Sequence, residues 1–261
     1  MTEWRFIDTG PCTASYNMAL DEAIAFSVRK GAAPPTLRFY GWDRPSVTLG
    51  AFQKSRDINV EFCLKNNIPI VRRLTGGRGI LHGDELTYSF CTRNEGYFSE
   101  GLLHSYRQLS SAFTSALQSL GLDVTMKMER ASVGEQNRTA LCFRSTSYGE
   151  ISLQAKKLIG SAQKRWTDGL LQQGSLPYAF DERAMRNIFN LSSSPLNDML
   201  IGLREVLPRF DEEELRQMIR VSFERTFRIR FLCADLSQEE DRLARELENR
   251  KYLSPHWNFQ R

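Results

Sequence analysis

The segment RRLTGGRGILH, residues 72–82, is the most informative stretch of this chain. The apolar residues at 68–72 predict a short strand, which runs directly into three glycines within four residues. Glycine lets backbone N–H groups approach a ligand closely, and the three arginines of the segment would attract an anion. The simpler alternative is a surface turn with solvated arginines. The spacing matches neither the GxxxxGK[ST] phosphate loop nor the dinucleotide-binding GxGxxG pattern.

His82 ends this segment and is one of only three histidines in the chain. It follows an apolar pair and precedes Gly83, Asp84 and Glu85. Two roles fit a histidine in this setting, an acid or base at a site and a hydrogen-bonded structural residue, and composition alone favours the structural role.

Cys142 is the second candidate for chemistry. It is followed by a polar run at 144–147 and then by a basic strand that carries Lys156 and Lys157. A nearby cation lowers the pKa of a thiol and raises the thiolate fraction. Adjacent strand residues point to opposite faces, so only one of the two lysines can face a pocket. The simpler alternatives are that Cys142 is a small buried hydrophobe and that both lysines are solvated.

Periodicity predicts strands through the middle of the chain and helices at its end. Strands are predicted at 4–7, 36–40, 46–49, 68–72, 86–92, 122–128, 140–143, 151–159 and 169–176. Helices are predicted at 15–28, 57–66, 99–120, 181–189, 195–207, from 211 onward and at 237–251. Gly121 stands where the residue after a helix belongs. We therefore expect an α+β fold with a sheet-rich core over about 1–180 and a helical extension over about 181–261.

Bulk composition restricts the function class. The 261 residues are 41% hydrophobic, and the net charge of 35 − 31 = +4 is too small for the basic footprint of a nucleic-acid binder. The five cysteines are odd in number and irregularly spaced, which argues against a disulfide framework and a zinc site and favours a reducing compartment. The first residues have no apolar signal region, and no apolar run is long enough to span a membrane. We expect a cytoplasmic protein.

Several of these motifs, in this order, resemble the biotin/lipoate protein ligase family. The matching segments are NMALDE (17–22), LRFYGW (37–42), RR-x-TGGR with LH and ELTYS (72–89), Lys157 with GSAQ (160–163), GS (174–175) and YLS with WN (252–258). Cys142 and Arg78 bring the chain closest to the cysteine-dependent octanoyltransferase branch. Two departures stand out: Gln173 replaces a frequent histidine, and Ala155 replaces a frequent glycine.

The resemblance implies a single ligase-like catalytic domain over 1–261, with mixed and antiparallel strands, flanking helices and the helical extension. It implies that Cys142 is the nucleophile and that Lys157 polarises the acyl carbonyl. It also implies a substrate-binding set, with no metal and no cofactor: Arg72, Arg73, Thr75, Gly76, Gly77, Arg78, Gly79, His82, Gly160, Ser161 and Ala162. The octanoyl donor implied is an acyl carrier protein. The acceptor is a lysine on a lipoyl domain protein, either glycine cleavage H protein or a 2-oxoacid dehydrogenase E2.

Three rival interpretations stay open at this stage. An ATP-dependent lipoate-protein ligase would hold an acyl adenylate at the arginine–glycine loop. An octanoyl amidotransferase would use the same cysteine with a lipoyl domain as donor. A binding module without activity would only hold an acylated carrier, and its Cys142 would be buried.

Overall fold

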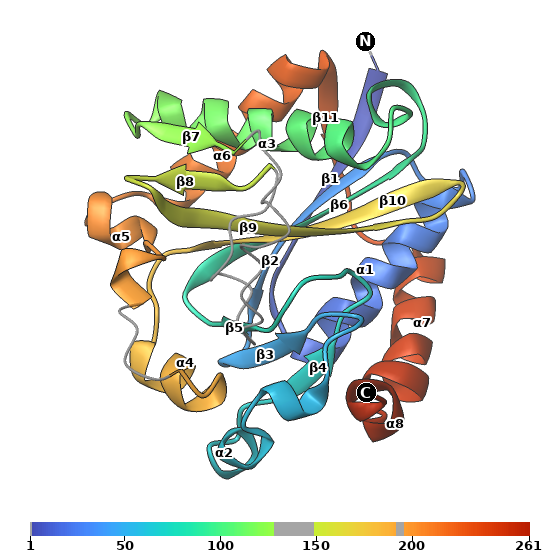
Figure 1. Cartoon of the computed structure of the whole chain (residues 1–261). Helices are drawn as coiled ribbons and strands as arrows, with labels where there is room; N and C mark the ends of the chain where they lie inside the picture. Colours follow the sequence, from blue (N-terminus) through green and yellow to red (C-terminus); the bar gives the residue numbers. More distant parts are fainter. Residues whose placement is uncertain (1, 128–148, 192–195) are drawn as a thin grey trace.

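A computed structural model of the chain describes residues 2–127, 149–191 and 196–261. Its centre is an eight-stranded mixed sheet in the order β11-β1-β2-β6-β10-β9-β8-β7 (Figure 1). The strands of this sheet are β1 (Thr2–Cys12), β2 (Thr36–Trp42), β6 (Glu85–Arg93), β7 (Val124–Met126), β8 (Ile151–Leu153), β9 (Lys156–Arg165), β10 (Gly169–Pro177) and β11 (Ile229–Cys233). The pairs β1–β11 and β1–β2 are parallel and the other pairs are antiparallel.

Helices cover both faces of the large sheet (Figure 1). On one face, α3 (Leu102–Ser119) and α6 (Glu212–Phe227) bury an aromatic-rich core against β1, β2 and β6. On the other face, α1 (Ala14–Arg29) packs against β6 and β10, and α7 (Gln238–Leu247) packs on α1. Both helix pairs follow the 3.6-residue apolar period, so the sheet lies between two hydrophobic layers.

A second, three-stranded sheet in the order β4-β3-β5 lies beside the first. It consists of β3 (Ser46–Leu49), β4 (Ile70–Arg72) and β5 (Ile80–His82). With α2 (Val60–Lys65) and α4 (Glu182–Ile188) it forms a separate hydrophobic cluster around Val47, Leu49 and Ile188. The segment 72–82 therefore links β4 to β5, and its glycine loop lies between them.

The predicted α+β class is confirmed, and so are most of the predicted elements. The prediction of one strand at 151–159 is wrong, because β8 and β9 form a hairpin that turns at Gln154 and Ala155. Both residues have positive φ, 52° and 62°, as a two-residue hairpin turn requires. Ala155 is the position where the family often carries glycine, which suits this left-handed backbone.

The prediction of one helix at 195–207 is also wrong. Short turns at Leu196–Asp198 and Leu203–Val206 (α5) are separated by residues that pair with β9. The Lys157 N–H donates to the Met199 carbonyl at 2.8 Å, and the Ile201 N–H donates to the Lys157 carbonyl at 3.2 Å. Tertiary pairing here overrides helical periodicity.

The C-terminal part contributes to the sheet as well as to the helical layers. The sequence prediction missed β11, whose buried Ile229 and Phe231 alternate with exposed residues next to β1. It also missed β5, which has only three residues. The charged helix predicted at 237–251 continues into a π-helical turn, Glu248–Tyr252, and then α8 (Pro255–Phe259). In the described part of the chain, no helix has both the length and the apolar composition needed to cross a bilayer.

Candidate active site

A narrow cavity lies between the two sheets. Strands from both sheets and one helix contribute to it. Its walls come from Met18, Tyr40, Trp42, Thr48, Arg73, Ile80, His82, Thr87, Gly160, Ser161, Ala162, Gln173, Gly174 and Ser175. Of the residues predicted from sequence, Arg73, His82, Gly160, Ser161 and Ala162 line this cavity.

His82 is held rigidly at the wall of the cavity. Its ring stacks on Trp42, with centroids 4.0 Å apart, and its Nε2 lies 2.9 Å from the Thr48 hydroxyl. Its Nδ1 lies 2.8 Å from Glu85 Oε1, which also accepts from the Thr87 hydroxyl. These contacts are those of a hydrogen-bonded structural residue, the role that composition favours. His82 also lines the cavity, so a bound ligand would lie next to it.

Glu85 is the buried carboxylate that orients this histidine. Burial raises the pKa of Glu85, but the charge and hydrogen bond of His82 and the hydrogen bond of Thr87 outweigh burial, so the pKa lies below its ordinary value. An ionised Glu85 accepts hydrogen bonds only, which fixes the donors that surround it.

Arg73 fastens the glycine loop to the cavity. Its guanidinium donates to the carbonyls of Gly76 and Arg78, at 2.7 and 2.8 Å. It also donates to the hydroxyls of Thr48, at 3.0 Å, and Thr75, at 3.1 Å. A flexible glycine loop is thereby given one shape by a single side chain.

The close packing of this loop explains a glycine in the segment that faces it. A Cβ added at Gly50, which follows β3, would lie 2.0 Å from the Gly77 carbonyl oxygen. Only glycine at position 50 lets the two segments come this close. Gly77 and Gly79 shape the loop but do not line the cavity.

Arg72 points away from the cavity, although it precedes Arg73 in the same segment. Its guanidinium donates to the carbonyls of Gly50, Gln53, Trp257 and Asn258 at 2.6–3.2 Å. Burial, and then the charges of nearby arginines, lower its pKa. Arg72 thus ties the C-terminal helix to the loop after β3 and does not reach the space that would hold a substrate.

Lys157 is fully buried, and its ammonium is ion-paired with the carboxylate of Glu150, which is 3% exposed. The expectation that both adjacent lysines are solvated is wrong for Lys157. It is the second residue of β9, the strand whose residues Gly160, Ser161 and Ala162 line the cavity. Lys157 itself is not part of the cavity wall, which this strand joins three residues further on, at Gly160.

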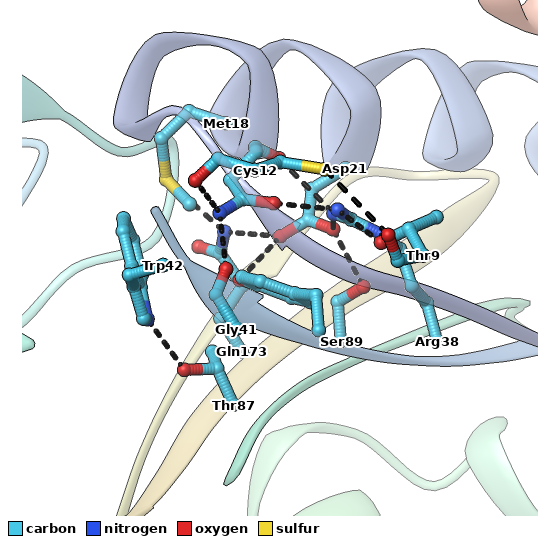
Figure 2. Close-up of polar contacts among 12 residues, drawn as sticks. Thr9, Cys12, Met18, Asp21, Arg38, Gly41, Trp42, Thr87, Ser89 and Gln173 are labelled. Atoms are coloured by element: carbon cyan, nitrogen blue, oxygen red, sulfur yellow. Dashed lines mark hydrogen bonds and ion pairs between the residues drawn. The ribbon is translucent and has the colours of Figure 1, made fainter. Parts of the chain in front are cut away.

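Sequence reasoning missed a buried polar network that Gln173 connects to the cavity wall (Figure 2). Gln173 of β10 receives a hydrogen bond from the Thr75 hydroxyl at 2.7 Å and donates one to Asp21 Oδ2 at 2.7 Å. Asp21 also accepts from Arg38 at 2.8 Å, and all three are at least 93% buried. Asp21 lies in the NMALDE segment, so that resemblance was the available signal.

The described cysteines differ in their suitability as nucleophiles. Burial raises the pKa of Cys63 to about 11 and that of Cys91 well above its ordinary value, which makes both poor thiolates at neutral pH. Cys142 and the strand predicted at 140–143 lie outside the described residues. Within residues 2–127, 149–191 and 196–261, no group of three or more His, Cys, Asp or Glu side chains is arranged to hold a metal ion.

The mixed sheet, the smaller sheet with its arginine–glycine loop and the buried lysine together define a catalytic domain of the biotin/lipoate ligase type. The chain belongs to the lipoyl protein ligase A/B catalytic domain family, which it matches over residues 13–224. A crystal structure of lipoate-protein ligase A bound with ATP has the same fold, with a TM-score of 0.84, 24% identity and 99% of both chains covered.

Two named relatives are similar to this chain over nearly its whole length. Octanoyltransferase LipM of Halalkalibacterium halodurans is 34% identical, with both chains covered completely. Octanoyltransferase LipM of Moorella thermoacetica is 36% identical, with 97% of each chain covered. The predicted resemblance to the octanoyltransferase branch is confirmed, and with it the assignment of the chain as an acyltransferase.

Proposed function

We propose that this chain takes an octanoyl group from an acyl carrier protein and transfers it, through a thioester on Cys142, to a lysine of a lipoyl carrier domain. The observation that carries the proposal is similarity along the entire chain to octanoyltransferases, at 34% identity for one of them. The site is compatible with it, since Met18, Tyr40, Trp42 and Ile80 contribute apolar surface to the narrow cavity.

The reaction consists of two acyl exchanges. The Cys142 thiolate attacks the thioester carbonyl of the donor, a new carbon–sulfur bond forms, and the carrier thiolate leaves and takes up a proton. The neutral ε-amine of the acceptor lysine then attacks the enzyme thioester, forms an amide and releases Cys142, while its proton passes to solvent or a nearby base. Thiol exchange is nearly thermoneutral and aminolysis of a thioester is downhill, so the sequence needs no ATP.

The described residues supply alignment and charge for these steps. The Lys157 ammonium stabilises negative charge as it develops on the carbonyl oxygen, an effect of the kind that is large in a water-poor site. The cavity binds the alkyl chain, at about 0.8 kcal/mol for each buried methylene. Arg73 and the loop it holds shape the end of the cavity near Thr75 and Gly76.

The partners follow from this chemistry. We propose octanoyl-acyl carrier protein as the donor, and either glycine cleavage H protein or a 2-oxoacid dehydrogenase E2 as the acceptor. A nucleophilic thiol works in a reducing compartment, and we place the protein in the cytoplasm.

The test combines pure protein, octanoyl-acyl carrier protein and an apo lipoyl domain without ATP, and follows octanoyl transfer by intact mass. We expect octanoylated lipoyl domain from the wild type and from the Cys63→Ala and Cys233→Ala proteins, and none from the Cys142→Ala protein. A requirement for ATP and free lipoate would identify a ligase instead. Transfer from an octanoylated lipoyl domain, but not from the acyl carrier protein, would identify an amidotransferase.

A further inference from the structure

Gln173 connects two buried charges, Arg73 and Asp21, and Figure 2 shows its contact with Asp21. Its side-chain oxygen accepts from the Thr75 hydroxyl at 2.7 Å, and its amide nitrogen donates to Asp21 Oδ2 at 2.7 Å. The Thr75 oxygen in turn accepts from Arg73 Nε at 3.1 Å. The chain of hydrogen bonds therefore runs from the Arg73 guanidinium through Thr75 and Gln173 to the Asp21 carboxylate.

The direction of this chain is fixed at both of its ends. Arg73 can only donate, because a guanidinium has no acceptor. Asp21 accepts from four donors: Arg38 at 2.8 Å, Ser89 at 2.6 Å, Tyr40 at 3.0 Å and Gln173 at 2.7 Å. A carboxyl group surrounded by donors is an acceptor-only carboxylate. Thr75 must then point its hydrogen at Gln173, and the Gln173 amide has only one orientation that satisfies both neighbours.

The consequence reaches the glycine loop. Arg73 is the side chain that holds the carbonyls of Gly76 and Arg78, and Thr75 is the first residue of the loop itself. Gln173 is thus a contact through which β10 of the large sheet holds the glycine loop. It makes this connection with a group that does not titrate, at a position where the family often carries a histidine.

We infer that Gln173 is a positioning residue, which holds Thr75, Arg73 and the glycine loop in their working arrangement and keeps that arrangement independent of pH. The inference rests on the proposed octanoyl transfer. It predicts that a histidine at this position works only while neutral, with one ring nitrogen donating to Asp21 and the other accepting from Thr75. A protonated ring donates from both nitrogens, opposes the Thr75 hydroxyl hydrogen and places a second cation near Arg73.

The first experiment compares the Gln173→Met and Gln173→His proteins with wild type in octanoyl transfer from octanoyl-acyl carrier protein. We expect Gln173→Met to lower kcat by between about 10- and 100-fold at every pH, as small misplacements at a site do. We expect Gln173→His to be close to wild type above its imidazole pKa and to lose activity as the pH falls through it, near 6.5 for an ordinary histidine. The wild type should lack this additional acid limb and show only the fall in rate that comes from protonation of the Cys142 thiolate and of the acceptor amine.

Gln172 offers the matched control, since it is the neighbouring residue on the other face of β10. It is fully buried and makes two side-chain hydrogen bonds, from Gln163 at 3.0 Å and to the Tyr88 hydroxyl at 2.9 Å. We expect Gln172→Met to lose stability to a similar degree but to change kcat less than Gln173→Met, with an unaltered pH profile. Equal loss of kcat in the two methionine variants, or superimposable pH profiles for Gln173→His and wild type, would overturn the inference.

A second measurement does not depend on catalysis. Amide hydrogen exchange at residues 75–79 should be faster in the Gln173→Met protein than in the Gln172→Met protein, because only the first variant releases the loop. Unchanged exchange in that segment would also reject the positioning role. If wild type transfers no octanoyl group at all, the proposed function fails, whereas the exchange measurement still decides whether Gln173 holds the loop.

Discussion

Two neighbouring arginines serve different purposes at the end of strand β4, where Arg72 is the last residue and Arg73 follows it. Arg72 and Arg73 are both at least 97% buried, and both guanidiniums are surrounded by oxygen acceptors. On the C-terminal side, Arg72 binds main-chain carbonyls of α8 and so holds the last helix in place. On the cavity side, Arg73 holds the glycine loop against the site. Both arginines are therefore similarly buried and similarly rich in hydrogen bonds. They differ only in what they contact, because Arg72 contacts the C-terminal helix and Arg73 contacts the glycine loop beside the cavity.

The largest loss of octanoyl transfer is expected for a substitution of Lys157. Lys157→Met should lower octanoyl transfer by about 100- to 1,000-fold, because the proposed mechanism uses its ammonium to stabilise the transition state. It should also lower the free energy of unfolding by about 3–5 kcal/mol, because it leaves Glu150 buried without this ion pair. Single-turnover acylation and denaturant unfolding measure the two effects.

The double variant Lys157→Met/Glu150→Gln separates these contributions. We expect it to recover much of the stability and none of the activity. Recovery of transfer together with stability would mean that Lys157 serves the fold alone.

Exchanging each arginine for lysine tests the comparison itself. Arg73→Lys should lower transfer by about tenfold, because a point charge cannot reproduce the guanidinium fork that holds two loop carbonyls. Arg72→Lys should instead lower the free energy of unfolding by about 2–3 kcal/mol and leave the rate per folded molecule near that of wild type. Steady-state kinetics corrected for the folded fraction decide the matter, and the reverse pattern would contradict the assignment of the two sides.

Stability is expected to fall in acid because of two buried carboxylates, Glu240 and Glu85, but only one of them is expected to affect activity. The pKa of Glu240 is lowered because the hydrogen bond and charge of Arg5 outweigh the effect of burial, and the pKa of Glu85 is lowered by His82 in the same way. A carboxyl with a lowered folded-state pKa stabilises the protein above its unfolded pKa, about 4.3, and loses that contribution as the pH falls through the folded value.

Glu240→Gln and Glu85→Gln should therefore each make the loss of stability below about pH 4.3 less steep. Only Glu85→Gln should also reduce octanoyl transfer at neutral pH, because Glu85 orients His82 at the cavity wall. Unfolding curves at several pH values, with one transfer assay at neutral pH, test both statements. An unchanged acid slope in either variant would show that its carboxyl is not held in the ionised state.

The smallest effect is expected at Tyr252 on the C-terminal side. Its hydroxyl donates to Glu22 at 2.6 Å and lies in the packing of the C-terminal turn against α1. Tyr252→Phe should cost about 1 kcal/mol of unfolding free energy and leave transfer unchanged. Denaturant titration measures the loss, and a large fall in the transfer rate would show that the C-terminal side is coupled to the site.

The sequence was sufficient where local signals agree with tertiary packing. Strand β3 was predicted with its bounds, and α3 with its C-terminal glycine, because strict periodicity and a turn residue coincide there. The β8–β9 hairpin was missed because Gln154 and Ala155 are not residues that usually occupy a two-residue turn. The break near Leu200 depends on pairing with β9, which no local pattern reveals.

The candidate site shows the same division. The segment 72–82 was correctly singled out, and its Arg73 and His82 do line the cavity. Sequence alone could not tell Arg72 from Arg73, because their different partners at the end of β4 come from elements that are distant in the sequence. Gln173 looked like a simple departure from the family pattern, since its partners Asp21 and Thr75 are far from it in the sequence.

The central claim is that the acyl group resides on Cys142 between donor and acceptor. The direct measurement is rapid quenching of the enzyme with octanoyl-acyl carrier protein in the absence of ATP, followed by mass analysis of the peptide that contains Cys142. The account predicts a gain of one octanoyl group on that cysteine, which disappears when apo lipoyl domain is added and octanoylated domain forms at the same rate. Undiminished transfer without any octanoylated Cys142, or by the Cys142→Ala protein, would contradict it.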